Sequence, residues 1–159
     1  QVITFNFEVD ERRRTYYNET GHWVHWYNYG RYPAYAIAVR RDAILKANVT
    51  YSLLYGGGAK YSNGEDSLFL HDCLKSGLRI YADTALLGKE VYRQSTWFSG
   101  YHEKFFLDRG VLYHDLYGCM AKLFSIRFLW SNRKEMLTTI NFRTAYGLMK
   151  QGIREGKLR

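Results

Sequence analysis

The sequence of 159 residues is 47% hydrophobic and 18% aromatic, which excludes a disordered or fibrous chain and allows a sizeable buried core. Its two cysteines, Cys73 and Cys119, exclude a disulfide-rich scaffold, and we expect both to be reduced thiols buried on helices. The net charge of +8 lies almost entirely in residues 122–159, which carry +7 and leave about +1 for residues 1–121.

Strands and one short helix are predicted for the first third of the chain. Alternating apolar residues predict a strand over 2–9, and a polar, aromatic connection over 11–32 follows it. Next come a short strand over 34–39, a short helix over 41–47 and an extended segment over 49–54.

The rest of the chain is predicted to change from mixed structure to helix. A helix over 65–76 precedes strands over 78–81 and 85–91, and helices dominate from residue 101 to the end. Strands mixed with helices, followed by helices, indicate an α/β unit without internal repeats. We place a domain over residues 1–121 and a basic amphipathic helical tail over 122–159.

Three interpretations of the tail over 122–159 remain open. A solvated basic face on helices that pack against the domain is the commonest case. Basic residues beside apolar ones also suit a peripheral contact with an anionic membrane surface. Nucleic acid is the weakest candidate partner, because no binding motif accompanies the charge.

Adjacent carboxylates, Glu65 and Asp66, stand where a glycine-rich loop turns into a helix. Ser62 with Glu65, or Asn63 with Asp66, has the spacing of a capping box. Acidic residues at a helix start are often present only because the helix dipole stabilises them. An ionised Asp beside a flexible loop can also accept a proton from a bound hydroxyl, which would make the pair a general-base site.

The string from Tyr55 to Tyr81 resembles the acceptor-side segment of inverting family 2 glycosyltransferases, in which a Glu-Asp pair opens a helix that a strand follows. Residues 92–98 are similar to the segment after that strand, and residues 31–48 to the strand and helix that precede the acceptor loop. The resemblance covers roughly residues 31–112. It implies the C-terminal part of a GT-A type mixed-sheet domain with a helical C-terminal tail.

This resemblance implies roles for seven residues. Asp66 would be the general base that deprotonates an acceptor hydroxyl, and Glu65 would orient the acceptor or the loop. Lys60 and Arg93 would stabilise charge on the leaving diphosphate, with a solvent-facing cation as the alternative for each. Trp97 would stack on an acceptor sugar, with a place in the core as the alternative. The remaining two residues, Gly57 and Gly58, would bind the substrate in the acceptor loop.

The donor would be a nucleotide-sugar, and the acceptor a glycan or a lipid-linked glycan. Family members hold a divalent metal, Mn²⁺ or Mg²⁺, with an Asp-x-Asp motif that is absent here. We therefore expect a fragment of a longer bacterial enzyme of polysaccharide biosynthesis, inactive by itself. His102 is the nearest candidate for a further metal ligand.

A different class of function remains open: a non-catalytic carbohydrate-binding or membrane-docking domain. Four rings crowd a segment that we expect to be a loop, namely Trp23, Trp26, Tyr27 and Tyr29. Exposed rings there would suit a carbohydrate. Asn18 and Asn48 each begin a glycosylation sequon. Neither a signal peptide nor a long apolar run is present, so we expect a cytoplasmic protein, in contact at most with the inner face of the plasma membrane.

Overall fold

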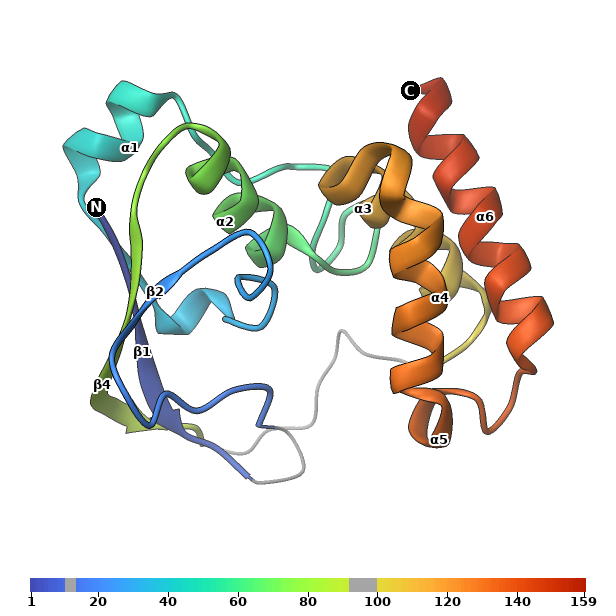
Figure 1. Cartoon of the computed structure of the whole chain (residues 1–159), viewed down its shortest axis with the longest axis horizontal. Coiled ribbons are helices and arrows are strands. Elements are labelled where there is room, and N and C mark those ends of the chain that lie inside the picture. The colour runs from blue at the N-terminus through green and yellow to red at the C-terminus, as the bar shows by residue number, and fades with distance from the viewer. Residues whose placement is uncertain (11–13, 92–99) are drawn as a thin grey trace. The chain divides into compact units, whose positions relative to one another are not determined.

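The computed structural model describes residues 1–10, 14–91 and 100–159 (Figure 1). The chain forms two compact units. The sheet unit consists of residues 1–52 and 65–94, and the helical unit of residues 53–64 and 95–159. The boundary predicted after residue 121 falls at the start of a helix inside the helical unit.

The sheet unit is built on one mixed sheet of four strands in the order β2-β4-β1-β3. The strands are β1 (Val2–Glu8), β2 (His22–Val24), β3 (Ile37–Val39) and β4 (Ile80–Lys89). β1 runs parallel to β4 and antiparallel to β3, while β2 runs antiparallel to β4. Two α-helices and a short 3₁₀ helix lie between the parallel strands in the chain, which is the kind of long connection that parallel pairing requires. The predicted α/β class is therefore confirmed for the described residues.

β1 forms because inward-facing and outward-facing side chains alternate along it. Val2, Thr4 and Asn6 are buried. The side-chain amide of Asn6 donates to the carbonyls of Asn18 (3.0 Å) and Thr84 (3.1 Å), and its oxygen accepts from the Asn18 N–H at 2.9 Å. A buried amide thus attaches the connection after β1 to the sheet.

The two glycosylation sequons have different surroundings. Asn18 is 2% exposed; its amide donates to the Asp83 carbonyl (3.0 Å) and its oxygen accepts from the Tyr32 hydroxyl (3.3 Å). Its side chain is therefore structural. Asn48 is exposed and ends α1 with a left-handed backbone, φ 51°.

The helices of the sheet unit are α1 (Arg41–Ala47) and α2 (Glu65–Lys75). α2 lies alongside the sheet (Figure 1) and buries Phe69, Leu70 and Cys73, the face that the sequence predicts. Gly77 follows the end of α2 and has a left-handed backbone, φ +77°. Glycine is favoured at this position because it adopts that conformation without strain.

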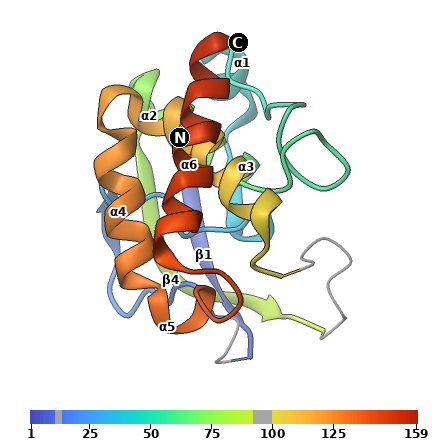
Figure 2. The ribbon, with the colours of Figure 1, turned by 90° about the vertical axis from the view of Figure 1, so that its right-hand side faces the viewer.

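The helical unit contains five helices among its described residues. They are α3 (Glu103–Tyr117), the short 3₁₀ helix η2 (Gly118–Met120), α4 (Ala121–Ser131), α5 (Arg133–Met136) and α6 (Phe142–Leu158). Figure 2 shows α4 and α6 side by side, as Figure 1 does. Their shared core is aromatic and aliphatic and includes Phe106, Tyr113, Leu129 and Met149.

α3 and α6 approach so closely that glycine is required at their contact. A Cβ on Gly110 would lie 2.2 Å from the Met149 carbonyl oxygen, and one on Gly152 would lie 2.0 Å from the Leu107 carbonyl oxygen. Real Cβ atoms do not approach so near, so any larger residue forces the helices apart.

The predictions of the strand over 2–9 and of the helices over 41–47 and 65–76 are confirmed. The segment 34–39 instead opens with a 3₁₀ helix, η1 (Ala34–Ala36), before β3. The two strands expected over 78–81 and 85–91 are one strand, β4, whose pairing with β1 shifts register at an irregularity. The interruption in the pattern therefore corresponds to shifts of register within one strand pair, and not to a turn between two strands.

Three further expectations were wrong. The connection over 11–32 contains β2. Cys119 is exposed on η2, whereas Cys73 is buried, and both are free. Neither capping box forms, because the Ser62 hydroxyl donates to Asp108 and the buried Asn63 Oδ1 has no hydrogen-bond partner in the described structure.

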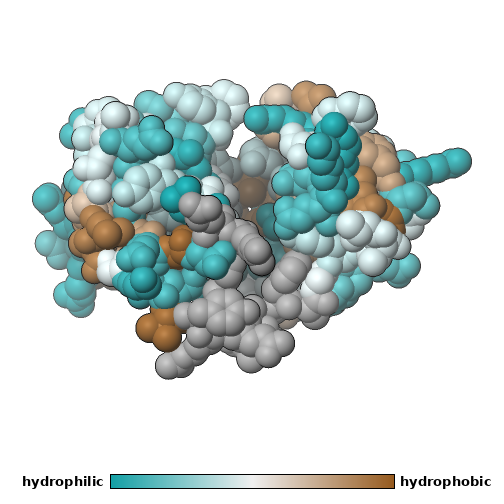
Figure 3. Space-filling model, turned by 90° about the horizontal axis from the view of Figure 1, so that it is seen from below, coloured by the Kyte–Doolittle hydropathy of each residue, from teal (hydrophilic) through white to brown (hydrophobic). Residues whose placement is uncertain are grey.

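Hydrophobic side chains form several separate patches, coloured brown, on the face drawn in Figure 3. Over the described part of the chain, no helix combines the length and the apolar composition needed to cross a bilayer.

Candidate functional site

The acidic pair opens α2 directly after the glycine-containing loop 53–64. Gly64, the last residue of that loop, has φ +107°, and a Cβ there would lie 2.4 Å from the Leu112 side chain. Both the backbone angle and the contact therefore require glycine. Glu65 and Asp66 follow it in the first turn of α2, as the sequence predicts.

Asp66 is half-buried, and its Oδ1 atom has no hydrogen-bond partner within the described residues. Burial and the adjacent charge of Glu65 raise the pKa of the Asp66 carboxyl to about 6, although a hydrogen bond from the Ala34 backbone N–H opposes this. The carboxylate is still mostly ionised at pH 7, but it holds a proton far more readily than an ordinary aspartate. The unpaired oxygen, Oδ1, is itself buried, and burial without a hydrogen-bond partner favours the protonated form of the carboxyl.

Tyr51 forms part of the same environment. Its ring stacks on Phe69 of α2, with the ring centroids 4.3 Å apart and the planes 3° from parallel. Burial, with the negative charge of Asp66 as the next cause, raises the pKa of the Tyr51 hydroxyl to about 12. Tyr51 is not predictable as part of this site from the sequence, since nothing in its local pattern indicates that the ring packs on α2.

The four clustered rings after β1 divide into two pairs. Trp26 and Tyr27 are 66% and 67% exposed and meet edge to face. Tyr29 is buried, and Trp23 packs against Tyr81. Trp23 remains 48% exposed, so Trp26 and Tyr27 are the most open of the four rings and Tyr29 is closed.

The loop that carries Trp26 and Tyr27 ends beside the first turn of α2. A Cβ on Gly30 would lie 3.8 Å from the Ser67 hydroxyl, and Tyr29 lies near His71, with ring centroids 6.0 Å apart. Figure 1 shows the segment after β2 next to the beginning of α2. The sheet unit thus brings an exposed aromatic loop to the helix that carries Asp66.

The predicted residues Gly57, Gly58 and Lys60 belong to the helical unit. Gly58 has φ +81°, which favours glycine, and no atom lies within 4 Å of its Cβ position. Lys60 Nζ forms an ion pair of 2.7 Å with Glu155 Oε1, which also accepts from the Tyr61 hydroxyl at 2.8 Å. The charge of Lys60 is therefore balanced within its own unit.

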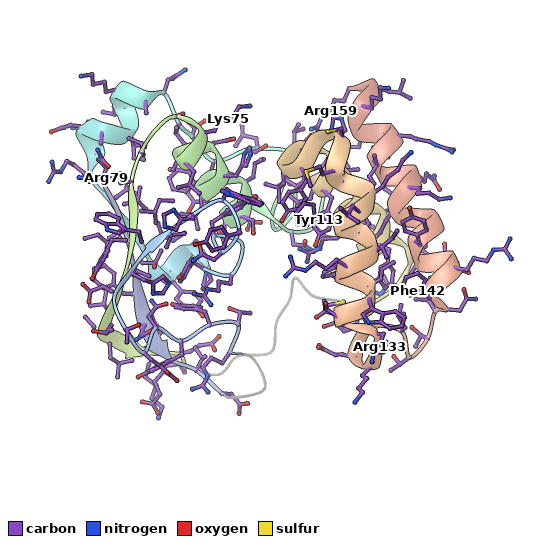
Figure 4. All side chains as sticks on the ribbon, in the orientation of Figure 1. Lys75, Arg79, Tyr113, Arg133, Phe142 and Arg159 are labelled. Atoms are coloured by element: carbon purple, nitrogen blue, oxygen red, sulfur yellow. The ribbon has the colours of Figure 1, made fainter. Side chains whose placement is uncertain are left out.

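Two more carboxylates hold this loop on the helices. Asp108 is buried on α3 and accepts from the Ser62 N–H (2.9 Å), the Ser62 hydroxyl (2.8 Å) and Lys104 (2.6 Å). Asp115 accepts from the Tyr55 hydroxyl at 2.6 Å and from Arg159, labelled at the end of α6 in Figure 4. A hollow of about 400 Å³ is lined by Lys60, Lys104, Asp108 and Glu155 among others, and its two lysines are each paired with a carboxylate.

The structure thus brings Glu65 and Asp66 together in the sheet unit and Gly57, Gly58 and Lys60 together in the helical unit. Arg93 and Trp97 lie outside the described residues. His102 precedes α3 as its N-cap residue. No group of three or more His, Cys, Asp or Glu side chains that could hold a metal ion occurs in the described ranges.

No known family, no curated protein and no solved structure matches this chain.

Proposed function

We propose that this chain is the acceptor-side part of an inverting glycosyltransferase of family 2 with the GT-A fold, in which Asp66 is the general base. The observation that carries the proposal is the state of Asp66: a half-buried carboxylate at a helix start, with an unpaired oxygen and a pKa raised to about 6. A helix-start aspartate that served only the helix dipole would accept from the first-turn amides and have a lowered pKa. The resemblance over residues 31–112 supplies the reaction class.

In the proposed reaction, an acceptor hydroxyl attacks the anomeric carbon of a nucleotide-sugar. Asp66 takes the hydroxyl proton as the new C–O bond forms, and the bond from that carbon to the diphosphate oxygen breaks on the opposite side. The products are the extended glycan and a nucleoside diphosphate. A single displacement of this kind inverts the anomeric configuration. The charge of Glu65 helps by raising the proton affinity of Asp66.

Binding roles are proposed for the remaining residues of the acceptor side. Gly57 and Gly58 leave the loop backbone open to an acceptor, which is a glycan or a lipid-linked glycan, and Trp97 stacks on one of its sugars. Lys60 and Arg93 stabilise the leaving diphosphate. Lys60 would first have to exchange its ion pair with Glu155 for the phosphate.

The divalent metal that the resemblance implies does not fit these residues. The sequence has no Asp-x-Asp motif, and the described side chains offer no group of three potential ligands. We assign the metal and most of the donor site to a part of the enzyme outside these residues. We propose the cytoplasm as the compartment, because both cysteines are free thiols.

The test is nucleoside diphosphate release from a panel of nucleotide-sugars with Mn²⁺ or Mg²⁺, on a form of the protein that includes the donor-binding part. Asp66→Asn should lower turnover about 100-fold or more. Asp72→Asn is the matched control, since Asp72 lies on the same helix and contacts only His71 among the hydrogen bonds described for it (3.0 Å). Equal turnover in the two variants would remove Asp66 from the mechanism.

A non-catalytic carbohydrate-binding domain is the second candidate, and the exposed rings of Trp26 and Tyr27 favour it. Glycan-array binding by the chain separates the two functions. For a binding domain, Trp26→Ala abolishes glycan binding while Asp66→Asn changes neither binding nor any turnover. For the transferase, Asp66→Asn abolishes turnover whether or not the array shows binding.

A further inference from the structure

α4 is hydrophobic on two opposite faces, and only one of them is covered. Ala121, Ser125 and Leu129 are buried against the helical core. On the other side, Leu123, Ile126 and Trp130 are 61%, 42% and 63% exposed. Their spacing of three and four residues places them in one stripe along the helix. An apolar stripe on a surface helix normally packs against another surface, so this stripe calls for an occupant.

α6 shows no comparable stripe. Its residues Ala145, Met149 and Ile153 are buried in the core, and its strongly exposed apolar residue, Leu158, is the last residue of the helix. Its exposed positions include Arg143, Gln151, Arg154 and Lys157. α6 therefore has an ordinary solvated basic face. α4 differs from it, although the sequence predicts a single basic amphipathic tail over residues 122–159.

The charged side chains along α4 and directly after it are basic. Lys122 and Arg127 are exposed on α4, Arg133 and Lys134 follow it, and residues 118–134 contain no Asp or Glu. The Arg133 guanidinium lies 4.8 Å from the centre of the Trp130 ring and donates to the Trp130 carbonyl at 2.8 Å. Glu135, the first acid after the stripe, accepts from the Tyr101 hydroxyl.

We propose that the α4 stripe of Leu123, Ile126 and Trp130 docks on an anionic lipid bilayer surface. Apolar side chains that enter the boundary of the headgroups, with lysine and arginine beside them at the lipid phosphates, are the pattern of an interfacial helix. Tryptophan is favoured at this depth because its ring is amphipathic. With 11 residues, α4 lies in the plane of the surface and does not span it.

Charge selects the bilayer over a second copy of the chain. Two α4 stripes facing each other would bring Lys122 and Arg127 of one copy against the same cations of the other, and like charges in a contact oppose it. Anionic headgroups instead neutralise those cations. The proposal does not depend on the transferase function.

The experiment is co-sedimentation of the full chain with vesicles of phosphatidylcholine alone, or containing roughly one-third phosphatidylglycerol. We expect binding only to the anionic vesicles, weakened by high salt. The double variants Leu123→Ser/Ile126→Ser and Lys122→Gln/Arg127→Gln should each lower the partition coefficient about tenfold or more.

α1 supplies the matched controls. Leu45 is 64% exposed, and Arg41 and Lys46 are exposed beside it. Leu45→Ser and Arg41→Gln/Lys46→Gln should bind anionic vesicles as the wild type does. Circular dichroism checks that each variant folds, and the charge variant tests the proposal even if the apolar variant does not fold.

Three results would overturn the proposal. The wild type could leave anionic vesicles unbound, or both α4 variants could bind as tightly as the wild type. The wild type could also be a dimer that Leu123→Ser/Ile126→Ser makes monomeric in size-exclusion chromatography, without any vesicle binding. That last result would assign the stripe to a second copy.

Discussion

At Asp66, the property that suits a general base also destabilises the fold. Burial and the charge of Glu65 disfavour the ionised carboxylate, so the folded chain holds the proton more tightly than the unfolded chain does. The free energy of unfolding therefore falls as pH rises from the ordinary pKa of 3.8 to about 6, and the penalty is fully present at pH 7. Such a conflict between stability and local chemistry is typical of functional sites.

Asp66→Asn should therefore stabilise the chain at pH 7, by about 1 kcal/mol once partial exposure is allowed for. Most of the gain should disappear by pH 3.5, where Asp66 is protonated in the folded chain and mostly protonated in the unfolded chain. Urea unfolding at pH 7 and pH 3.5 measures this, with Asp72→Asn as the control that should show no such gain. A variant less stable than the wild type at pH 7 would mean that the carboxylate has a structural partner.

If Asp66 is the general base of the proposed transferase, its pKa also sets the pH dependence of turnover. Because the base must be ionised, turnover should rise with pH and level off above the pKa of about 6. A pH–rate profile of kcat/KM, measured with saturating metal, should show this acidic limb. An activity that is flat from pH 5 to pH 8 would argue against Asp66 as the base.

Asn18 matches a glycosylation sequon by sequence, but its buried amide bridges Asp83 and Tyr32. Asn18→Ala should lower the free energy of unfolding by about 2 kcal/mol, because it leaves buried partners unsatisfied. The neighbouring Glu19 is exposed, so Glu19→Ala is the control and should change stability little. In a glycosylating host, mass spectrometry should find Asn18 unmodified, and glycan on Asn18 would contradict the structure.

The place of Asp66 in the first turn of a helix could be predicted from the sequence, because a helix start is a local property of the chain. The packing of Tyr51 on α2 could not, and Lys60, which the resemblance assigns to a phosphate, forms an ion pair with Glu155. Those contacts join residues far apart in the chain. Spacing along a chain does not report such pairs, so the partners of a charged residue must come from the structure.

At the scale of elements, the close contact between α3 and α6 depends on glycines, whose lack of a side chain lets the two backbones approach. Gly152→Ala should destabilise the chain by about 3 kcal/mol, because its Cβ would lie 2.0 Å from the Leu107 carbonyl. Gly147 is on the same helix with nothing within 4 Å of its Cβ position. Gly147→Ala should stabilise by about 0.5 to 1 kcal/mol through helix propensity. Thermal unfolding of the pair measures both, and similar effects in the two would contradict the close approach.

The regular elements were predictable where one local signal dominates. α1 and α2 have helical spacing and a defined end, at Asn48 and Gly77. β2 has only three residues and lies within a polar segment, so its pairing with β4 gives no periodic signal. The length of β4 was missed because shifts of register interrupt its alternation. The close contact of α3 with α6 has no counterpart in either helix alone.

At the scale of the whole molecule, charge and chain path both separate the two units. The helical unit carries +7 and the sheet unit +1. The loop 53–64 leaves the sheet unit and joins the helical unit before α2 returns. The domain boundary predicted from composition lies at residue 121, where the charge changes. Composition does not reveal that the short loop 53–64 packs with helices far along the chain.

The loop should therefore depend on the helices for its order. Asp108→Ala removes the acceptor of the Ser62 N–H and hydroxyl. Hydrogen exchange of the Gly56 and Tyr61 amides, which bond within the loop at 2.9 Å and 3.0 Å, should become about 30-fold faster or more. Amides in the middle of α2 should exchange as in the wild type, because Asp108 makes its hydrogen bonds within the helical unit.

Glu103→Ala is the control for this experiment, since Glu103 is exposed in the first turn of the same helix. It should leave the loop amides protected. If Asp108→Ala also leaves them protected, Asp115 and Glu155 hold the loop without it, through Tyr55 and Tyr61. If α2 loses protection together with the loop, the two units unfold as one, and order in the loop 53–64 and at Asp66 cannot be varied separately.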